Sequence, residues 1–135
     1  MYIRHMESEV TLVIDPQSSA PVYRQVVDNL RSLLVSGALK PGDALPTVRE
    51  LGLELGVHFN TIAEAYRLLA GEGWLDLRRR RGAVVLERAA PAEQPETLER
   101  FRRSLRQLVA QHRSEGLSLS AVAQEFQDLA QELSA

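Results

Sequence analysis

A short helix that is closed at both ends limits most strongly what this chain can fold into. Thr47-Val48-Arg49-Glu50 is a capping box, in which the threonine hydroxyl and the glutamate carboxylate satisfy backbone amides that a first helical turn leaves free. Gly56 ends this helix after about two and a half turns. A turn at Gly56-Val57 follows, and apolar residues spaced three and four apart then predict a third helix over about 58–71. Two short helices joined by so tight a turn are typical of a helix-turn-helix.

The flanking segments extend this motif. From Pro21 onward, apolar residues at helical spacing predict a first helix that ends at Gly37. After the third helix, 74–77 and 83–86 are strand-like runs separated by arginines and Gly82, which predicts a β-hairpin. We therefore expect a mainly α fold with a small β-hairpin: a winged helix-turn-helix over 21–88, preceded by an N-terminal arm over 1–20 in which 10–14 forms a short strand or extended segment.

The last part of the chain has a different pattern. Residues 89–96 are rich in alanine and proline and predict a linker, and 97–135 predict a tail of two helices, each with a narrow apolar seam. So small a unit cannot cover both seams by itself, so we expect it to pair with a second copy and form a homodimer. The alternative is a hairpin packed on the rest of the same chain. The seam residues are Leu98, Phe101, Leu105, Leu108, Leu119, Val122, Phe126, Leu129 and Leu133.

Composition excludes several classes of protein. The chain has 135 residues and no cysteine, which excludes thiol catalysis, disulfides and cysteine-ligated metals and favours a cytoplasmic protein. No apolar stretch is long enough to span a membrane. His5, His58 and His112 are too scattered to predict a metal site, and no cofactor motif is present. No nucleophile is paired with a base and no glycine-rich phosphate loop occurs, so we do not expect an enzyme.

The distribution of charge and polar groups points to nucleic acid. The formal net charge is −2, yet four arginines stand together at 78–81 in the predicted wing, where Arg79, Arg80 and Arg81 would attract phosphates. The predicted third helix offers side chains and free amides in its first turn to phosphates and base edges. The residues of that turn are His58, Phe59, Asn60 and Thr61.

The residues alone leave three alternatives open. Arg49 could equally be a solvated ion-pair partner of Glu50 or Glu54. The arginine run could be only a charged hairpin tip. The Tyr66 side chain is expected in the core by its spacing, although its hydroxyl could reach a phosphate.

The chain resembles the GntR-type transcription regulators almost continuously from Pro21 to Val85. The resemblance implies that Thr47, Arg49 and Thr61 touch DNA, with Arg49 reading a guanine, and that Gly82 and its neighbouring arginines reach the minor groove. His58 is a departure, because that position usually holds a small capping residue. The matching segments are Pro21-Val22-Tyr23-Arg24-Gln25, Gly37-Ala38-Leu39-Lys40-Pro41-Gly42, Leu45-Pro46-Thr47-Val48-Arg49-Glu50-Leu51, Leu55-Gly56-Val57, Asn60-Thr61-Ile62, Ala65-Tyr66 and Glu72-Gly73.

The short two-helix tail resembles the YtrA-like subfamily, which lacks a large effector-binding domain. The resemblance implies a sequence-specific transcription regulator, expected to be a repressor that binds an inverted-repeat DNA operator as a homodimer. The alternative from another class is a winged-helix adaptor that binds protein. The tail has few polar residues that could converge on a ligand, so the sequence identifies no small-molecule effector.

Overall fold

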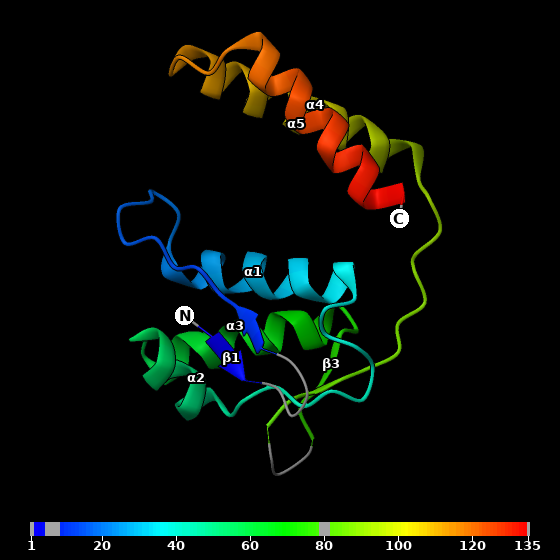
Figure 1. Cartoon of the computed structure of the whole chain (residues 1–135). Coiled ribbons are helices and arrows are strands. Elements are labelled where there is room, and N and C mark those ends of the chain that lie inside the picture. The colour runs from blue at the N-terminus through cyan, green and yellow to red at the C-terminus, as the bar shows by residue number, and fades with distance from the viewer. Residues whose placement is uncertain (1, 5–8, 79–81, 135) are drawn as a thin grey trace. The chain divides into compact units, whose positions relative to one another are not determined.

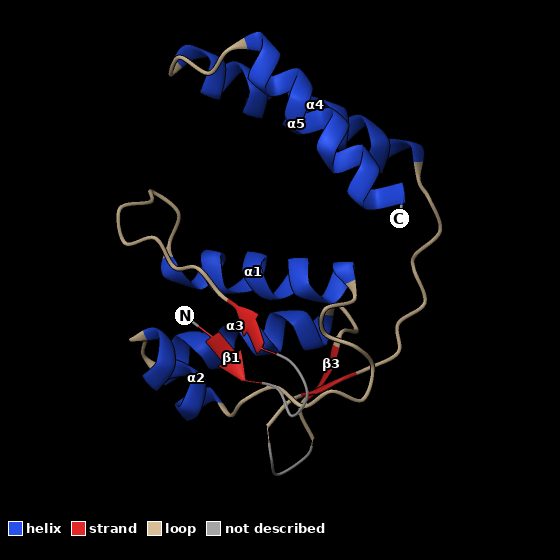
Figure 2. Cartoon of the chain, in the orientation of Figure 1, coloured by secondary structure: helices blue, strands red, loops and turns tan. Residues whose placement is uncertain are grey.

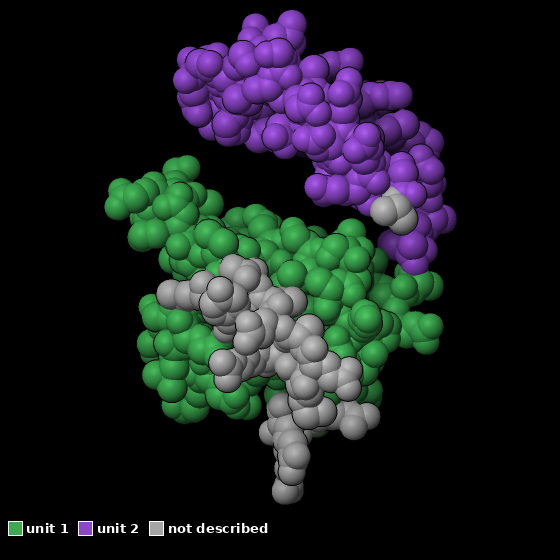
Figure 3. Space-filling model, viewed as in Figure 1, with its two compact units in different colours: residues 1–89 green, residues 90–135 purple. Residues whose placement is uncertain are grey.

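The computed structural model describes residues 2–4, 9–78 and 82–134, which form two compact units, Met1–Ala89 and Ala90–Ala135. Figure 3 colours these units separately. Within the described ranges, no helix is both long enough and apolar enough to cross a membrane.

The first unit is a three-helix core with a small hairpin, as Figures 1 and 2 show. The hairpin strands pair antiparallel, with Leu75 opposite Val85 and Asp76 opposite Val84. A mainly α fold with a short β-hairpin was predicted, and the structure confirms it. The helices are α1 (Val22–Ser36), α2 (Val48–Leu55) and α3 (Phe59–Gly71), and the hairpin strands are β3 (Leu75–Asp76) and β4 (Val84–Val85).

The predicted helix ends are formed by the expected residues. Gly37 ends α1 and Gly56 ends α2, both with the left-handed backbone (φ 83° and 67°) that glycine adopts without steric cost. At the start of α2, the Thr47 hydroxyl accepts the Glu50 N–H at 3.1 Å. The Glu50 carboxylate accepts a hydrogen bond from that same hydroxyl at 3.0 Å. The Glu50 carboxylate therefore closes the capping box by bonding the Thr47 side chain.

The segment between α1 and α2 adds an edge to the hairpin. The Gly42 N–H donates to the Val85 carbonyl, the Val85 N–H donates to the Asp43 carbonyl, and Ala44 bridges Val84. The Leu45 N–H donates to the Ala83 carbonyl at 2.8 Å. These bonds tie the base of the wing to the residues just before α2.

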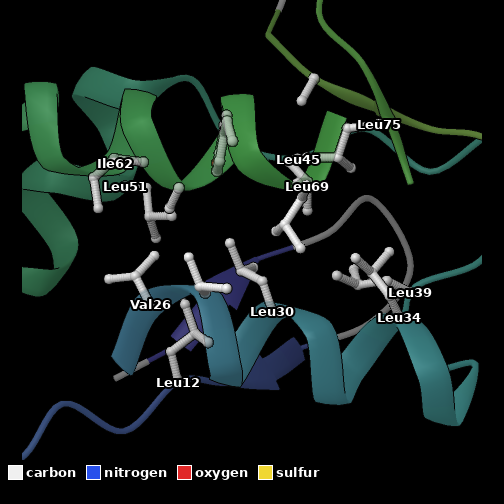
Figure 4. Close-up of a cluster of buried hydrophobic side chains, with 14 of the residues drawn as sticks. Leu12, Val26, Leu30, Leu34, Leu39, Leu45, Leu51, Ile62, Leu69 and Leu75 are labelled. Carbon is white, nitrogen blue, oxygen red and sulfur yellow. The ribbon is translucent and has the colours of Figure 1, made fainter. Parts of the chain in front are cut away.

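One cluster of buried apolar side chains joins all these elements. Figure 4 shows leucines of α1 pointing toward α3, with side chains from the wing and from the segment before α2 completing the cluster. Burial of this area is the main stabilising term of the unit. The buried members are Leu12, Val26, Val27, Leu30, Leu34, Leu39, Leu45, Leu51, Leu55, Ile62, Ala65, Tyr66, Leu69, Leu75, Ala83 and Val85.

The N-terminal segment is more ordered than the simple arm expected for 1–20. Strands β1 (Tyr2–Arg4) and β2 (Glu9–Thr11) pair antiparallel, and Leu12, directly after β2, is fully buried. The strand expected over 10–14 therefore lies slightly earlier, because the chain after Leu12 is held by side chains and not by a neighbouring strand. The Asn29 amide bonds both the N–H and the carbonyl of Val13.

The second unit consists of α4 (Pro95–Ser114) and α5 (Leu119–Ser134). Helix α4 begins at Pro95, so the last two residues of the predicted linker are helical; proline fits the first turn because its missing N–H would have no helical partner there. Ser118 caps α5 by accepting the Ala121 N–H at 3.1 Å. Among the described residues of this unit, only Val122 is buried.

Candidate nucleic-acid interface

The first turn of α3 is formed around an imidazole cap. His58 precedes the helix, and its Nδ1 accepts the Asn60 N–H at 3.1 Å, as a serine or threonine oxygen would. The departure at His58 therefore keeps the capping function. Asn60 is exposed and Thr61 is partly exposed beside it, so both predicted contact residues reach the surface of this turn.

A close backbone approach sets the spacing between α2 and α3. A Cβ on Gly52 would lie 2.6 Å from the Val57 carbonyl oxygen, nearer than side-chain atoms approach a backbone oxygen. The Val57 N–H donates to the Gly52 carbonyl at 2.9 Å. Sequence reasoning missed Gly52, although a glycine inside a predicted helix is a signal for such a contact.

Arg49 lies over an aromatic ring. Its guanidinium carbon is 4.3 Å from the centre of the Phe59 ring, and the His58 ring stacks on Phe59 with centroids 4.5 Å apart and planes at 26°. Within the described residues, no carboxylate lies within ion-pair distance of Arg49, so the alternative of a pair with Glu50 or Glu54 is not observed. The turn between α2 and α3 thus brings three of the predicted site residues into one contact group.

Gly82 places the end of the wing beside the start of α2. Its φ is +90°, and a Cβ there would lie 3.3 Å from the Leu45 carbonyl and 3.5 Å from the Thr47 Cα. The predicted residues Thr47 and Gly82 are therefore neighbours. Both line an open hollow whose other walls come from α2, α3 and the wing: Val48, Ala63, Tyr66, Arg67, Leu77 and Ala83.

Arg67 is a second residue that sequence reasoning missed. It is exposed on α3 and lines the hollow beside Gly82. Its spacing from Asn60 and Ala63 along the exposed face of a predicted helix could have identified it. A cation in this place adds positive charge near the predicted contact residues.

Tyr66 belongs to the core, as its spacing predicted. Only 2% of its surface is exposed, and its hydroxyl donates to the Pro46 carbonyl at 2.7 Å. Burial raises the pKa of Tyr66 well above its usual value, and the charges of Glu50 and Glu54 raise it further. The hydroxyl therefore stays protonated and holds the segment just before Thr47.

The wing arginines fall into two groups. Arg78 forms an ion pair with Asp76 at 3.0 Å, and this hydrogen bond raises the pKa of the guanidinium. The predicted contacts Arg79, Arg80 and Arg81 lie outside the described residues. In the part of the chain that the structure describes, no group of three or more metal-ligating side chains comes together.

Comparison with known proteins identifies the family. The model for "Bacterial regulatory proteins, gntR family" matches residues 22–85. The chain is also 35% identical over 106 residues to the "HTH-type transcriptional repressor YtrA" of Bacillus subtilis (strain 168), covering 78% of this chain and 82% of that protein. This chain belongs to the GntR family. It is a DNA-binding transcription regulator and not an enzyme.

Solved structures extend the likeness over the tail of this GntR regulator. "YtrA from Sulfolobus acidocaldarius, a GntR-family transcription factor" is 32% identical, with a TM-score of 0.54, and covers 91% of this chain and 99% of its own. A Listeria monocytogenes EGD-e protein described as a transcriptional antiterminator has a TM-score of 0.66 at 23% identity, covering 95% and 92%. The second shows the shared fold alone. The predicted likeness to the YtrA-like subfamily is confirmed.

Proposed function

We propose that this GntR regulator is a repressor that binds an inverted-repeat operator as a homodimer. Helix α3 enters the major groove, and the wing at 78–82 contacts the flanking minor groove or backbone. The observation that carries the proposal is that α2 links the predicted contacts: Arg49 in its first turn lies over Phe59 of α3, and Thr47 at its start lies beside Gly82 of the wing. The repressor role is supported by the B. subtilis relative, which is described as a transcriptional repressor.

Each residue of this surface has a side chain that suits the DNA group it is proposed to contact. The Arg49 guanidinium is exposed and reads a guanine, whose O6 and N7 accept two parallel hydrogen bonds. Thr47 and Thr61 bind phosphates near the start of a helix, where free amides and the helix dipole favour anions. For this contact the Thr47 hydroxyl proton turns from the Glu50 carboxylate to the phosphate, while the oxygen still accepts the Glu50 N–H. His58, Phe59 and Asn60 form the rest of the major-groove surface, and Arg79, Arg80 and Arg81 with Gly82 serve the wing contact.

The tail supports the dimer through its exposed apolar seam. Phe101 is 59% exposed, Leu129 is 51% exposed and Leu133 is 76% exposed, so α4 and α5 leave much of their apolar surface in water. Pairing of two copies would bury this surface, with Leu98, Leu105, Leu108, Leu119 and Phe126 completing the interface. Val122, which was also predicted for the interface, is already buried within the unit and offers little surface to a second copy.

Charge also favours contact between α4 of one copy and α5 of the other. Helix α4 carries more arginines than carboxylates, whereas α5 carries Glu125, Asp128 and Glu132 and neither lysine nor arginine. A two-fold axis then spaces the two copies of α3 by about one turn of DNA, roughly 34 Å, which selects an inverted repeat.

The test is selection of random double-stranded DNA on the purified protein, followed by titration of the enriched sequence at two salt concentrations. We expect an inverted repeat bound by two chains. Absence of enrichment, or weak binding that salt abolishes, would contradict the proposal and favour the adaptor class.

Two arginine variants test the division of labour at the interface. Arg49→Ala should weaken operator binding by about 1–3 kcal/mol and relax the preference at one base pair of each half-site. Arg81→Ala should weaken binding to all sequences and lower the salt dependence. Equal losses on selected and random DNA for both variants would contradict this division.

A further inference from the structure

We propose that Phe59 is a positioning residue: its ring holds the Arg49 guanidinium in the orientation that discriminates the base. The proposal rests on the proposed role of Arg49 as a base reader. Phe59 is the first residue of α3 and Arg49 lies in the first turn of α2, so one side-chain contact at 4.3 Å joins the two helices of the motif.

The geometry of stacking suits guanine recognition. A guanidinium stacked parallel to a ring uses its π face for the contact and keeps its N–H groups at the edge, in its own plane. Bidentate binding to guanine O6 and N7 needs these in-plane donors. The ring therefore fixes the direction of the donors without occupying them.

Phe59 is itself held from two sides. The His58 ring stacks on it, and the bond from the Asn60 N–H to Nδ1 fixes the His58 ring in turn. The missing Cβ of Gly52 keeps this turn close to α2, because a Cβ there would lie 2.6 Å from the Val57 carbonyl oxygen, and it would also touch the Phe59 N and Cα at 3.5 Å. The ring thus has a defined place from which to orient Arg49.

Among the described residues, no carboxylate competes with a base for the guanidinium. Arg49 and Phe59 line a hollow whose remaining walls are mainly apolar or glycine, and the structure describes no carboxylate at ion-pair distance from Arg49. A free arginine side chain loses rotamer entropy when it is fixed. Because the ring already restrains Arg49, less rotamer entropy is lost when the side chain forms the specific bidentate contact. A mobile arginine, in contrast, can still reach phosphates of any sequence. Loss of the ring should therefore reduce discrimination more than nonspecific binding.

The experiment measures discrimination as a ratio. The affinity for the selected operator is divided by the affinity for an operator changed at the base pair that Arg49→Ala relaxes. We expect Phe59→Leu and Phe59→Met to lower this ratio about two- to five-fold, and Phe59→Tyr to retain it, because tyrosine keeps the π face. In the Arg49→Ala background, Phe59→Leu should leave the ratio unchanged. Leu53→Ala, in the same hollow, is the matched control and should retain the wild-type ratio.

The outcomes separate the two proposals. If wild-type protein prefers no sequence, or Arg49→Ala relaxes no position, the proposed role of Arg49 fails and this inference fails with it. If Arg49→Ala relaxes a position but Phe59→Leu and Phe59→Met keep the wild-type ratio there, only the role of Phe59 is overturned. A merely structural role would lower affinity for all DNA and the melting temperature together, with the ratio unchanged, and that result would also overturn it.

Discussion

The two units of this regulator complete their cores in different ways. In the first unit every helix and the wing contribute side chains to one buried cluster, and even the N-terminal segment adds Leu12. In the described residues of the second unit only Val122 is buried, while Phe101 and Leu129 stay more than half exposed. Both units have amphipathic helices, so amphipathicity alone does not say where the apolar face is covered. The first unit covers its apolar faces within the chain, whereas the described residues of the second leave most of theirs exposed.

The largest expected effect is in the core of the first unit. Leu51 is fully buried and Leu53, on the same helix α2, is 85% exposed. Leu51→Ala should lower the free energy of unfolding by about 2–5 kcal/mol, through lost burial and the cavity that remains. Urea unfolding measures the change. Leu53→Ala is the matched control and should stay within about 0.5 kcal/mol of wild type. Similar losses in the two variants would contradict the assigned core.

The second prediction tests the exposed seam of the tail. Leu129→Glu places a charge where we expect a second copy to pack, so the dimer dissociation constant should rise on the order of 100-fold. Sedimentation at micromolar concentration measures the change. Gln131→Glu, an exposed position on the same helix, adds the same charge away from the seam and should leave the dimer intact. A Leu129→Glu protein that remains dimeric would show that this seam is not the interface.

Tyr66→Phe tests how the core of the first unit supports the start of α2. The variant removes the bond to the Pro46 carbonyl and should cost about 0.5–1.5 kcal/mol near neutral pH. Because the folded-state pKa of Tyr66 is raised above its ordinary value of 10.0, its contribution is complete below about pH 10 and is lost as pH rises toward the folded pKa.

Thermal or urea unfolding of wild type and Tyr66→Phe at several pH values measures this contribution. The gap in stability should be constant up to about pH 10 and narrow above it. Tyr23→Phe is the control, since the described part of the chain gives that half-buried hydroxyl no hydrogen-bond partner. A gap that widens above pH 10 would contradict the assigned burial of the hydroxyl.

Local signals explain why most of the fold could be predicted. The Thr47 cap and the glycine that ends α2 act within a few residues of chain, and the apolar spacing of α1 and α3 repeats every turn. The position of the hairpin and the two tail helices can also be predicted from local patterns. The N-terminal segment was harder to predict, because Leu12 is positioned by tertiary packing and Val13 is held by Asn29, sixteen residues away.

For the candidate site, the sequence indicates candidate residues but not their arrangement. The exposed turn and the capping box identify Arg49, Thr47 and the residues before Thr61 as candidates. No local pattern places Arg49 over Phe59 or Gly82 against Thr47, because both contacts depend on how separate elements pack. The sequence names candidates, and only the fold shows which of them touch.

The smallest expected effect comes from an ion pair between elements of the first unit. Arg31 on α1 bonds Glu72 after α3 through two contacts, at 2.6 and 3.2 Å, which raise the pKa of the arginine. Glu72→Gln should cost up to about 1 kcal/mol, because both side chains are about one-third exposed and solvent screens them. In the tail, Glu99→Gln breaks only a pair within α4, with Arg102, and should cost about 0.3 kcal/mol. Urea unfolding at low and high salt measures both losses. The difference in free energy of unfolding between the two variants should shrink at high salt. Equal losses of stability at low salt would show that the Arg31–Glu72 pair gains nothing from joining two elements.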